Sequence, residues 1–217
     1  KHPAIKRALQ DVDPSIGFEI HTDGDLPARS GVGSSSSFSA ALLMALAAYD
    51  KRELSGRQLA KEVISFEQDK LGELVGIQDQ IQASFGGFNI TMIEKSGSFS
   101  CVRLDIESGI PAQINDELLL VHTMTARSSS QVQKVNFDNV KHDSLKEVFN
   151  ISQLVATGLL NNSLDYQEFC SFLTDSWRCK RRLISGSTKL SILEDLYAHG
   201  IRLGARTGKL LGAGGGG

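Results

Sequence analysis

The chain has 217 residues, of which 41% are hydrophobic and 22% charged, a composition typical of a globular protein with a substantial core. Its 23 basic and 25 acidic residues give a formal net charge of −2, which offers no reason to expect a nucleic-acid partner or an anionic membrane surface. No apolar run reaches the roughly 20 residues of a membrane helix, and three cysteines that fit no zinc motif favour a reduced, cytoplasmic protein.

The first part of the chain alternates apolar and polar residues and then becomes a loop. Apolar residues at every second position predict a half-buried strand over residues 16–20. Residues 23–33 are rich in Gly, Asp, Pro and Ser, which indicates a loop. From Ser34 to Tyr49 the apolar residues follow helical spacing on one face and add apolar flanks, so we expect a helix that is buried on nearly all sides.

The middle of the chain predicts two helices followed by strands. Ser55 and Gln58 form a capping-box pair at a helix start, and Gly72 is a suitable stop for that helix. A short helix is predicted over residues 78–84, before the Gly86-Gly87 pair. Aromatic and β-branched residues then predict strands, over residues 88–94, 99–106 and 117–124.

The remainder is mainly helical. Apolar spacing predicts a helix over residues 145–159, a next helix capped by Ser163, and a last one over residues 191–199 that ends before Gly200. The order of a strand, helices, strands and helices indicates an α+β fold with two sub-domains, which we place at residues 1–108 and 109–217.

A glycine-serine loop over residues 27–37 leads directly into the first apolar helix. The first turn of a helix has unpaired amide donors and a partial positive charge, and Gly31 and Gly33 allow close approach of an anion. No Walker lysine is present, and Ser36 stands where a dinucleotide loop needs its third glycine. The loop therefore predicts binding of a nucleotide's phosphates by another motif. A flexible linker is the alternative, although linkers rarely run into a long apolar helix.

The order of residues in this loop resembles the second signature motif of the GHMP kinases, P-x-x-x-G-L-G-S-S-A. The positions that match are Pro27, Gly31, Gly33, Ser34 and Ser35. Val32 and Ser36 are mild departures. The resemblance implies an enzyme that uses ATP and Mg²⁺, with Ser35 as a ligand of the metal. The nucleotide-binding residues that it implies are Gly31, Val32, Gly33, Ser34, Ser35 and Ser36.

Two acids fit the phosphoryl transfer that this resemblance implies. From the residues alone, each is more readily explained as a solvated surface group. The family places an aspartate eight residues before the second glycine of a Gly-Gly pair, and Asp79 and Gly87 have that spacing. The resemblance therefore implies that Asp79 is the catalytic base. It also implies a glutamate ligand for Mg²⁺ on the preceding helix, for which we take Glu67 in preference to Glu62 and Glu73.

The last nine residues, 209–217, resemble the third GHMP motif, K-x-x-G-A-G-G-G-G. Such a run lets backbone amides line a pocket, and the resemblance implies that Gly214 and Gly215 lie beside the transferred phosphate. An engineered tail is the alternative, but Lys209 and Gly212 precede the run at the positions of the motif.

Three further stretches resemble the bacterial branch of the family that phosphorylates heptose 7-phosphate, with fucokinases as relatives. They are residues 76–89, 125–130 and 177–183. The resemblance implies transfer to the anomeric hydroxyl of a sugar phosphate, whose phosphate Arg127, Lys180 and Arg181 would bind. Another sugar kinase such as a fucokinase, or a non-catalytic sensor or regulator with the same fold, is the alternative. The oligomeric state stays open.

Both ends of the chain lack parts that the family pattern contains. The first signature of the family, a strand pair with sugar-binding groups, has no counterpart before Lys1, and no strand follows the final glycines. We therefore expect a GHMP kinase fold truncated at both ends, with unpaired sheet edges and little or no kinase activity of its own.

Overall fold

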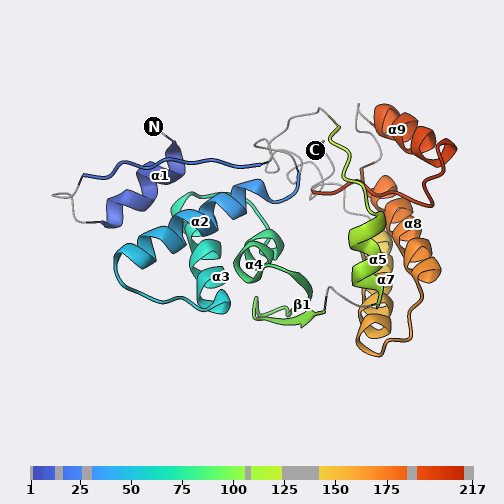
Figure 1. Cartoon of the computed structure of the whole chain (residues 1–217), viewed down its shortest axis with the longest axis horizontal. Helices are drawn as coiled ribbons and strands as arrows, with labels where there is room; N and C mark the ends of the chain where they lie inside the picture. Colours follow the sequence, from blue (N-terminus) through green and yellow to red (C-terminus); the bar gives the residue numbers. More distant parts are fainter. Residues whose placement is uncertain are drawn as a thin grey trace. The chain divides into compact units, whose positions relative to one another are not determined.

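The computed structural model describes residues 2–12, 17–25, 31–105, 109–123, 142–184 and 190–212 (Figure 1). The chain divides into two compact units, Lys1–Gly86 and Gly87–Gly217. The predicted mixed helix-and-strand class is confirmed. The units separate at the Gly-Gly pair, whose φ angles of +60° and +74° suit a sharp change of chain direction, whereas the sequence placed a boundary at residue 108.

The regular elements of the first unit are all helical in its described residues. Its elements are α1 (Pro3–Ala8), η1 (Leu9–Asp11), α2 (Ser34–Tyr49), α3 (Gly56–Ser65), the π-helical turn η2 (Phe66–Lys70) and α4 (Gln78–Phe85). Leu42 and Phe66 pack with the alanines of α1 in one cluster, and Leu59 and Val63 of α3 pack with Ala40 of α2 in another. Sequence reasoning missed α1, although a proline at a first helical position is a known signal for a helix start.

Helix α2 begins at the predicted residue, but it is not buried on nearly all sides. Met44 and Tyr49 are about half exposed, at 49% and 51%, while Leu42 and Ala47 are buried. Among the described residues, α1, α3 and α4 contact α2, and they leave one of its faces uncovered. The expectation of nearly complete burial was therefore wrong.

Helix α3 begins with the predicted capping box. The Gln58 amide donates to Ser55 Oγ at 3.3 Å, and the Ser55 amide donates to Gln58 Oε1 at 2.9 Å. These two bonds satisfy amide donors that the helix start would otherwise leave open. The helical segment ends with η2, and Gly72 follows in the left-handed region with φ +68°.

The strand predicted over residues 16–20 does not form in the described residues 17–20. The alternation is visible in their burial, since Phe18 and Ile20 are half-buried while Gly17 and Glu19 are exposed. Phe18 also packs edge-on against Tyr49 with ring centroids 5.1 Å apart. The prediction was wrong because a strand needs a hydrogen-bonded neighbour, and no described segment pairs with this one.

The second unit opens with a hairpin formed by the first two of the predicted strands. Strand β1 (Phe88–Ile93) pairs antiparallel with β2 (Phe99–Leu104), and the register runs from Phe88↔Leu104 to Ile93↔Phe99. The turn is closed by a 2.9 Å bond from the Glu94 amide to the Ser98 carbonyl, with Gly97 at φ +81°. Both strand predictions for this region are confirmed.

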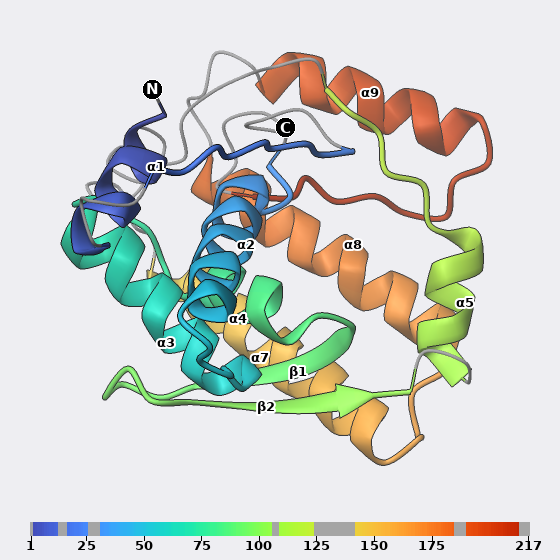
Figure 2. The ribbon, with the colours of Figure 1, turned by 60° about the vertical axis from the view of Figure 1, so that its left-hand side comes forward.

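Helices make up most of the rest of this unit (Figure 2). They are α5 (Gly109–Glu117), α7 (His142–Leu160), α8 (Tyr166–Leu183) and α9 (Leu190–Arg202). The cap of α8 is Asp165, which forms a capping box with Glu168, so the prediction of Ser163 was wrong. Gly200 lies inside α9 rather than ending it. No helix in the described ranges is both long and apolar enough to cross a membrane.

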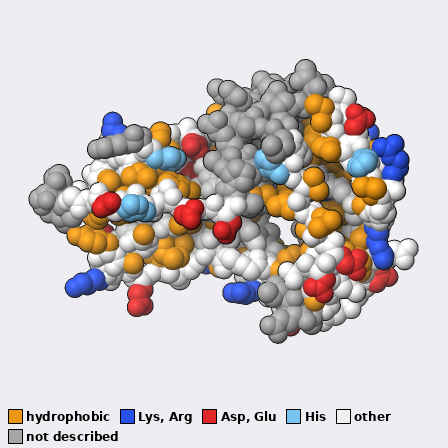
Figure 3. All heavy atoms as spheres, turned by 45° about the horizontal axis from the view of Figure 1, so that its top comes forward, with side chains coloured by type: hydrophobic (Ala, Val, Ile, Leu, Met, Phe, Trp, Pro, Cys, Tyr) orange, Lys and Arg blue, Asp and Glu red, His pale blue; other side chains and the backbone are white. Residues whose placement is uncertain are grey.

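The third predicted strand, over residues 117–124, is absent. Glu117 ends α5, and the described residues 118–123 carry no regular structure. The side chains of Leu118, Leu119, Leu120 and Val121 are 56%, 88%, 56% and 65% exposed. Hydrophobic side chains accordingly reach the surface in Figure 3. As with residues 17–20, no described strand lies beside this segment to form a ladder.

Two helical glycines give opposite expectations for the same substitution. A Cβ on Gly158 of α7 would lie 2.8 Å from Cβ of Leu164, whereas a Cβ on Gly200 of α9 would have Ala205 at 3.9 Å as its nearest neighbour. Alanine favours the helix over glycine by about 1 kcal/mol. We expect Gly200→Ala to raise the free energy of unfolding by about 0.4–1 kcal/mol, and Gly158→Ala to lower it by about 1–3 kcal/mol through overpacking.

Denaturant unfolding of the two variants beside the wild-type chain checks this pair. Equal effects of the two substitutions would contradict the described packing of Leu164 on α7.

Candidate active site

The glycine-serine loop meets the start of α2 as the sequence predicts. Gly33 occupies the N-cap position with φ +76°, and Gly31 has φ +78°. Both angles lie in the left-handed region, which strongly favours glycine. The N-cap residue Gly33 has no side chain to cap this helix, and first-turn amides, which have no partner inside a helix, are groups that commonly bind an anion. Ser34 and Ser35 lie in this first turn, and the side chain of Ser35 is exposed.

Asp79 lies directly against this helix start. It stands in the first turn of α4, and a Cβ placed on Gly33 would lie 3.4 Å from Cγ of Asp79 and 3.7 Å from its Oδ2. Although the Asp79 residue is exposed as a whole, partial burial of its carboxyl raises its pKa above the ordinary value. The structure thus brings the predicted phosphate loop and the predicted base together.

Glu67 is buried at the junction of three helical segments. Its residue is 1% exposed and lies in η2, where the Leu71 amide donates to the Phe66 carbonyl five residues earlier. Ser36 Oγ of α2 donates to Glu67 Oε2 at 3.0 Å, and Gln80 Nε2 of α4 donates to the same oxygen at 2.5 Å. Single π turns of this kind occur often at functional sites.

Two buried oxygens beside this junction have no hydrogen-bond donor among the described residues. They are Oε1 of Glu67 and Oε1 of Gln80. Buried carboxylate oxygens are normally paired or bound to a cation. Burial raises the pKa of Glu73, and the nearby charge of Glu67 raises it further. An electron-rich position of this kind suits a divalent cation.

These oxygens fit Mg²⁺ in chemical type. Mg²⁺ takes oxygen ligands, keeps several waters and commonly uses only one or two carboxylates together with substrate phosphates. The part of the chain that the structure describes contains no group of three His, Cys, Asp or Glu side chains that could hold a metal ion. Glu67 with a hydroxyl of the α2 start would therefore suit a phosphate-bound Mg²⁺ better than a closed metal cage.

Sequence reasoning did not predict Gln80. Its residue is 1% exposed, yet glutamine gives no sign in the sequence of being buried. Ser36, predicted as a nucleotide-binding residue, directs its hydroxyl to Glu67, whereas Ser35, predicted as the metal ligand, is exposed beside it. The predicted roles of both serines stay predictions.

The residues expected to bind the sugar phosphate are placed differently. Lys180 Nζ of α8 donates to the carbonyls of Leu210 at 2.9 Å and Gly212 at 2.5 Å. Arg181 forms an ion pair with Glu194 of α9, with its Nε 3.1 Å from Glu194 Oε1. Both cations therefore already have protein partners. Arg127, Gly214 and Gly215 lie outside the described residues.

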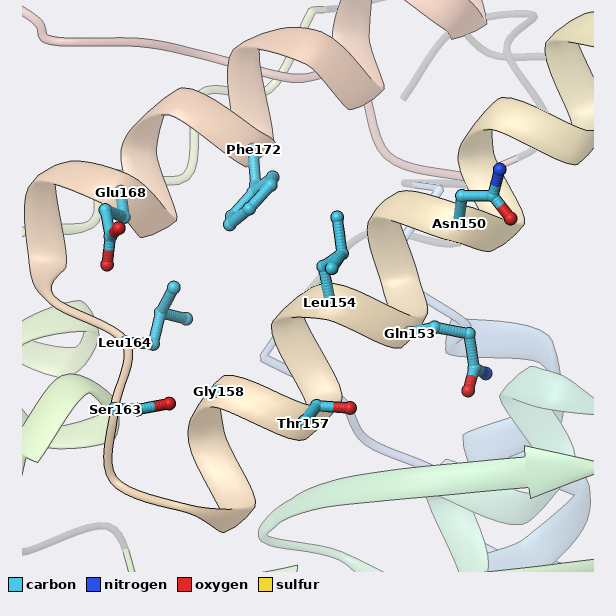
Figure 4. Close-up of a pocket in the computed structure, with 9 residues that line it drawn as sticks. All are labelled: Asn150, Gln153, Leu154, Thr157, Gly158, Ser163, Leu164, Glu168 and Phe172. Carbon is cyan, nitrogen blue, oxygen red and sulfur yellow. The ribbon is translucent and has the colours of Figure 1, made fainter.

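A hollow of about 520 Å³ lies between α7 and α8 (Figure 4). Leu154, Leu164 and Phe172 point into the space between the two helices. The residues that line it are Asn150, Gln153, Leu154, Thr157, Gly158, Ser163, Leu164, Glu168 and Phe172. None of them is a predicted site residue, and the hollow takes no part in the site described above.

Ser36 and Ser35 form a matched pair for testing the Glu67 junction. Ser36→Ala removes a hydroxyl donor from a buried carboxylate, and we expect it to lower the free energy of unfolding by about 1–3 kcal/mol. Ser35→Ala, on the exposed neighbour, is expected to change it by no more than about 0.5 kcal/mol. Urea unfolding of both variants measures the difference. A neutral Ser36→Ala would show that the hydroxyl does not stabilise the Glu67 carboxylate.

Comparison with known proteins agrees with the motifs. The family description "GHMP kinases N terminal domain" matches residues 3–87. The chain is 28% identical over 204 residues to D-glycero-alpha-D-manno-heptose 7-phosphate kinase of Campylobacter jejuni, covering 93% of this chain and 60% of that protein. It is 26% identical over 221 residues to a bifunctional fucokinase/GDP-fucose pyrophosphorylase of Arabidopsis thaliana, covering 94% of this chain and 20% of that protein.

A solved structure shares the fold. It is the crystal structure of a D-glycero-D-manno-heptose 1-phosphate kinase from Bacteroides thetaiotaomicron, with a TM-score of 0.69 and 24% identity over 97% of this chain and 60% of that one. The chain thus spans about 60% of the length of these heptose phosphate kinases. The predicted GHMP kinase fold is confirmed, and residues 3–87 of this chain match the N-terminal domain of the GHMP kinases.

Proposed function

We propose that the protein is an ATP-dependent kinase that phosphorylates the anomeric hydroxyl of a sugar, with D-glycero-D-manno-heptose 7-phosphate as the substrate. The observation that carries this proposal is the carboxyl of Asp79 against Gly33 at the start of α2. Phosphoryl transfer needs a phosphate-binding element and a group that positions or deprotonates the attacking hydroxyl, side by side.

In the proposed reaction the helix start binds the phosphates of ATP. The amides of the first turn of α2 and the hydroxyls of Ser34 and Ser35 bind phosphate oxygens, and the helix dipole favours their negative charge. The left-handed backbone at Gly31 and Gly33 keeps side chains out of this space.

Asp79 acts as the proposed base. Its carboxylate accepts the proton of the anomeric hydroxyl while the hydroxyl oxygen forms a bond to the γ-phosphorus, and the bond to the β–γ bridging oxygen breaks to release ADP. An anomeric hydroxyl is more acidic than an ordinary alcohol, so a single carboxylate suffices. The raised pKa of Asp79 makes it a stronger base than an ordinary aspartate.

Glu67 and Ser35 are the proposed ligands of Mg²⁺. The cation, when bound, would neutralise charge that develops on the β- and γ-phosphates. Oε1 of Glu67, which has no donor among the described residues, supports this role, and the bonds from Ser36 and Gln80 to Oε2 hold the carboxylate in one orientation.

The proposal of a heptose substrate is supported by a relative that is named for this activity. The Campylobacter jejuni kinase acts on heptose 7-phosphate and aligns with 93% of this chain. For the 7-phosphate we propose Arg127 as the binding residue, because Arg grips phosphate with two hydrogen bonds, and because Lys180 and Arg181 bind protein groups in the structure. Gly214 and Gly215 are proposed to line the pocket at the transferred phosphate.

Asp79→Asn tests the proposed base. We expect it to lower kcat by about 10²–10⁴-fold while nucleotide affinity changes little. Wild-type activity should be present above the pKa of Asp79 and be lost as the pH falls through it, at a pH above that of an ordinary aspartate, because that pKa is raised. The Asn variant should lack this acidic limb. Glu53→Gln, on an exposed residue of the same unit, is the control.

A coupled assay of ADP release provides the measurement. It is run on the 217-residue chain and on a version that spans the length of the relatives, with heptose 7-phosphate and with fucose as sugars and with or without Mg²⁺. Turnover of fucose alone would make the protein a different sugar kinase. Nucleotide binding without turnover of any sugar would instead identify a non-catalytic regulator.

A further inference from the structure

Four polar contacts fasten residues 207–212 along α8. Each joins a side chain of the helix to this segment, which lies immediately before the glycine run in the sequence. They are Thr174 Oγ1 to Thr207 Oγ1 at 2.6 Å, Lys209 Nζ to Ser176 Oγ at 2.7 Å, and Lys180 Nζ to the carbonyls of Leu210 and Gly212 at 2.9 and 2.5 Å. The segment therefore follows the helix rather than leaving it.

Apolar packing fixes the same segment. Leu210 packs against the cluster of Trp177, Ile184 and Leu193, and the Trp177 residue is only 3% exposed. A Cβ on Gly208 would lie 3.5 Å from the ring of Tyr197, so the backbone runs close to α9 as well. The positions of the Leu210 and Gly212 carbonyls follow from this packing together with the Lys180 bonds.

Lys180 and Lys209 are an unusual pair because no acid balances them. The described residues form no ion pair with either lysine. The pKa of Lys180 is lowered to about 8, mainly by burial and secondly by the charge of Lys209. Burial also lowers the pKa of Lys209. The charge of Cys179 acts to raise the pKa of Lys209. Arg181 and Glu194, which lie nearby in the sequence of α8 and in α9, form an ion pair with each other. A half-buried ammonium needs strong acceptors, and the two carbonyls supply them.

We infer that Lys180 is a positioning residue rather than a residue that contacts the sugar phosphate. It fixes the carbonyls of Leu210 and Gly212, and thereby the backbone from which the glycine run continues in the sequence. Two acceptors from residues two apart converge on one ammonium, whose N–H groups point in tetrahedral directions. Gly212 has φ +66°, so the chain turns sharply where Lys180 holds it. The expected effect of Lys180 on catalysis rests on the proposed function. The structural clamp, meaning the hydrogen bonds from Lys180 to the two carbonyls, does not.

Hydrogen–deuterium exchange of the 217-residue chain tests the clamp without any assay of activity. Lys180→Met keeps the length of the side chain and removes its donors, and we expect exchange in peptides that cover residues 207–212 to become about tenfold faster or more. Lys180→Arg keeps the charge and should restore most of the protection. Lys146→Met, on an exposed lysine of α7, should have no effect. Unchanged exchange in Lys180→Met would overturn the inference.

The pH dependence of exchange provides a second test. Lys180 holds the carbonyls most strongly while it is charged, so protection of residues 207–212 should weaken as the pH rises through about 8. These rates are corrected for the intrinsic effect of pH on exchange. In Lys180→Arg the guanidinium stays charged, and the weakening should disappear. If protection weakened in the same way in Lys180→Arg, the pH dependence would belong to Lys209 instead, and this would contradict the role of Lys180.

Kinetic measurements on a catalytically active form of the protein distinguish a positioning role of Lys180 from direct contact with the substrate. A positioning role predicts that Lys180→Met lowers kcat by about 10- to 100-fold with the KM for the sugar phosphate nearly unchanged, and that Lys180→Arg recovers much of kcat. A rise in the KM for the sugar phosphate alone, with exchange unaltered, would make Lys180 a substrate contact and overturn the inference. If the wild-type protein shows no turnover, the proposed function fails, and the exchange measurements alone decide the inference.

Discussion

The arrangement of the candidate site depends on one oxygen of a buried carboxylate. Glu67 Oε2 accepts hydrogen bonds from Ser36 at the start of α2 and from Gln80 at the start of α4, while Glu67 itself belongs to the π turn after α3. A buried carboxylate without donors costs several kcal/mol, so these helix starts are held at one point. Gly33 and Asp79 are close neighbours in sequence of the two donors, and their proximity follows from this junction.

Local signals in the sequence predicted much of the fold. The capping box at Ser55 and the helix that begins at Ser34 depend on residues within a few positions of each other, and the structure contains both. The strands predicted around Phe18 and Leu119 depend on a partner elsewhere in the chain. Periodicity predicts the shape of a strand, but it carries no information about whether a neighbour is present to form the ladder.

The same distinction applies to the candidate site. Motif spacing predicted the loop at Gly33 and the acid at Asp79, and the structure places them side by side. The burial of Gln80 and the carbonyl partners of Lys180 arise from contacts between residues 13 and about 30 positions apart, which no local pattern reports. The sequence therefore predicted the two residues that the structure brings together, but not those that hold them in place.

The exposed segment Leu118–Val121 affects how the chain behaves at high concentration. Four successive exposed apolar residues in irregular backbone form a window of the kind that readily starts intermolecular β-pairing and aggregation. Asp116 and Glu117 directly precede the segment. Stacking of copies in register would bring these like charges together, so the two acids act as gatekeepers that favour dispersed molecules at low ionic strength.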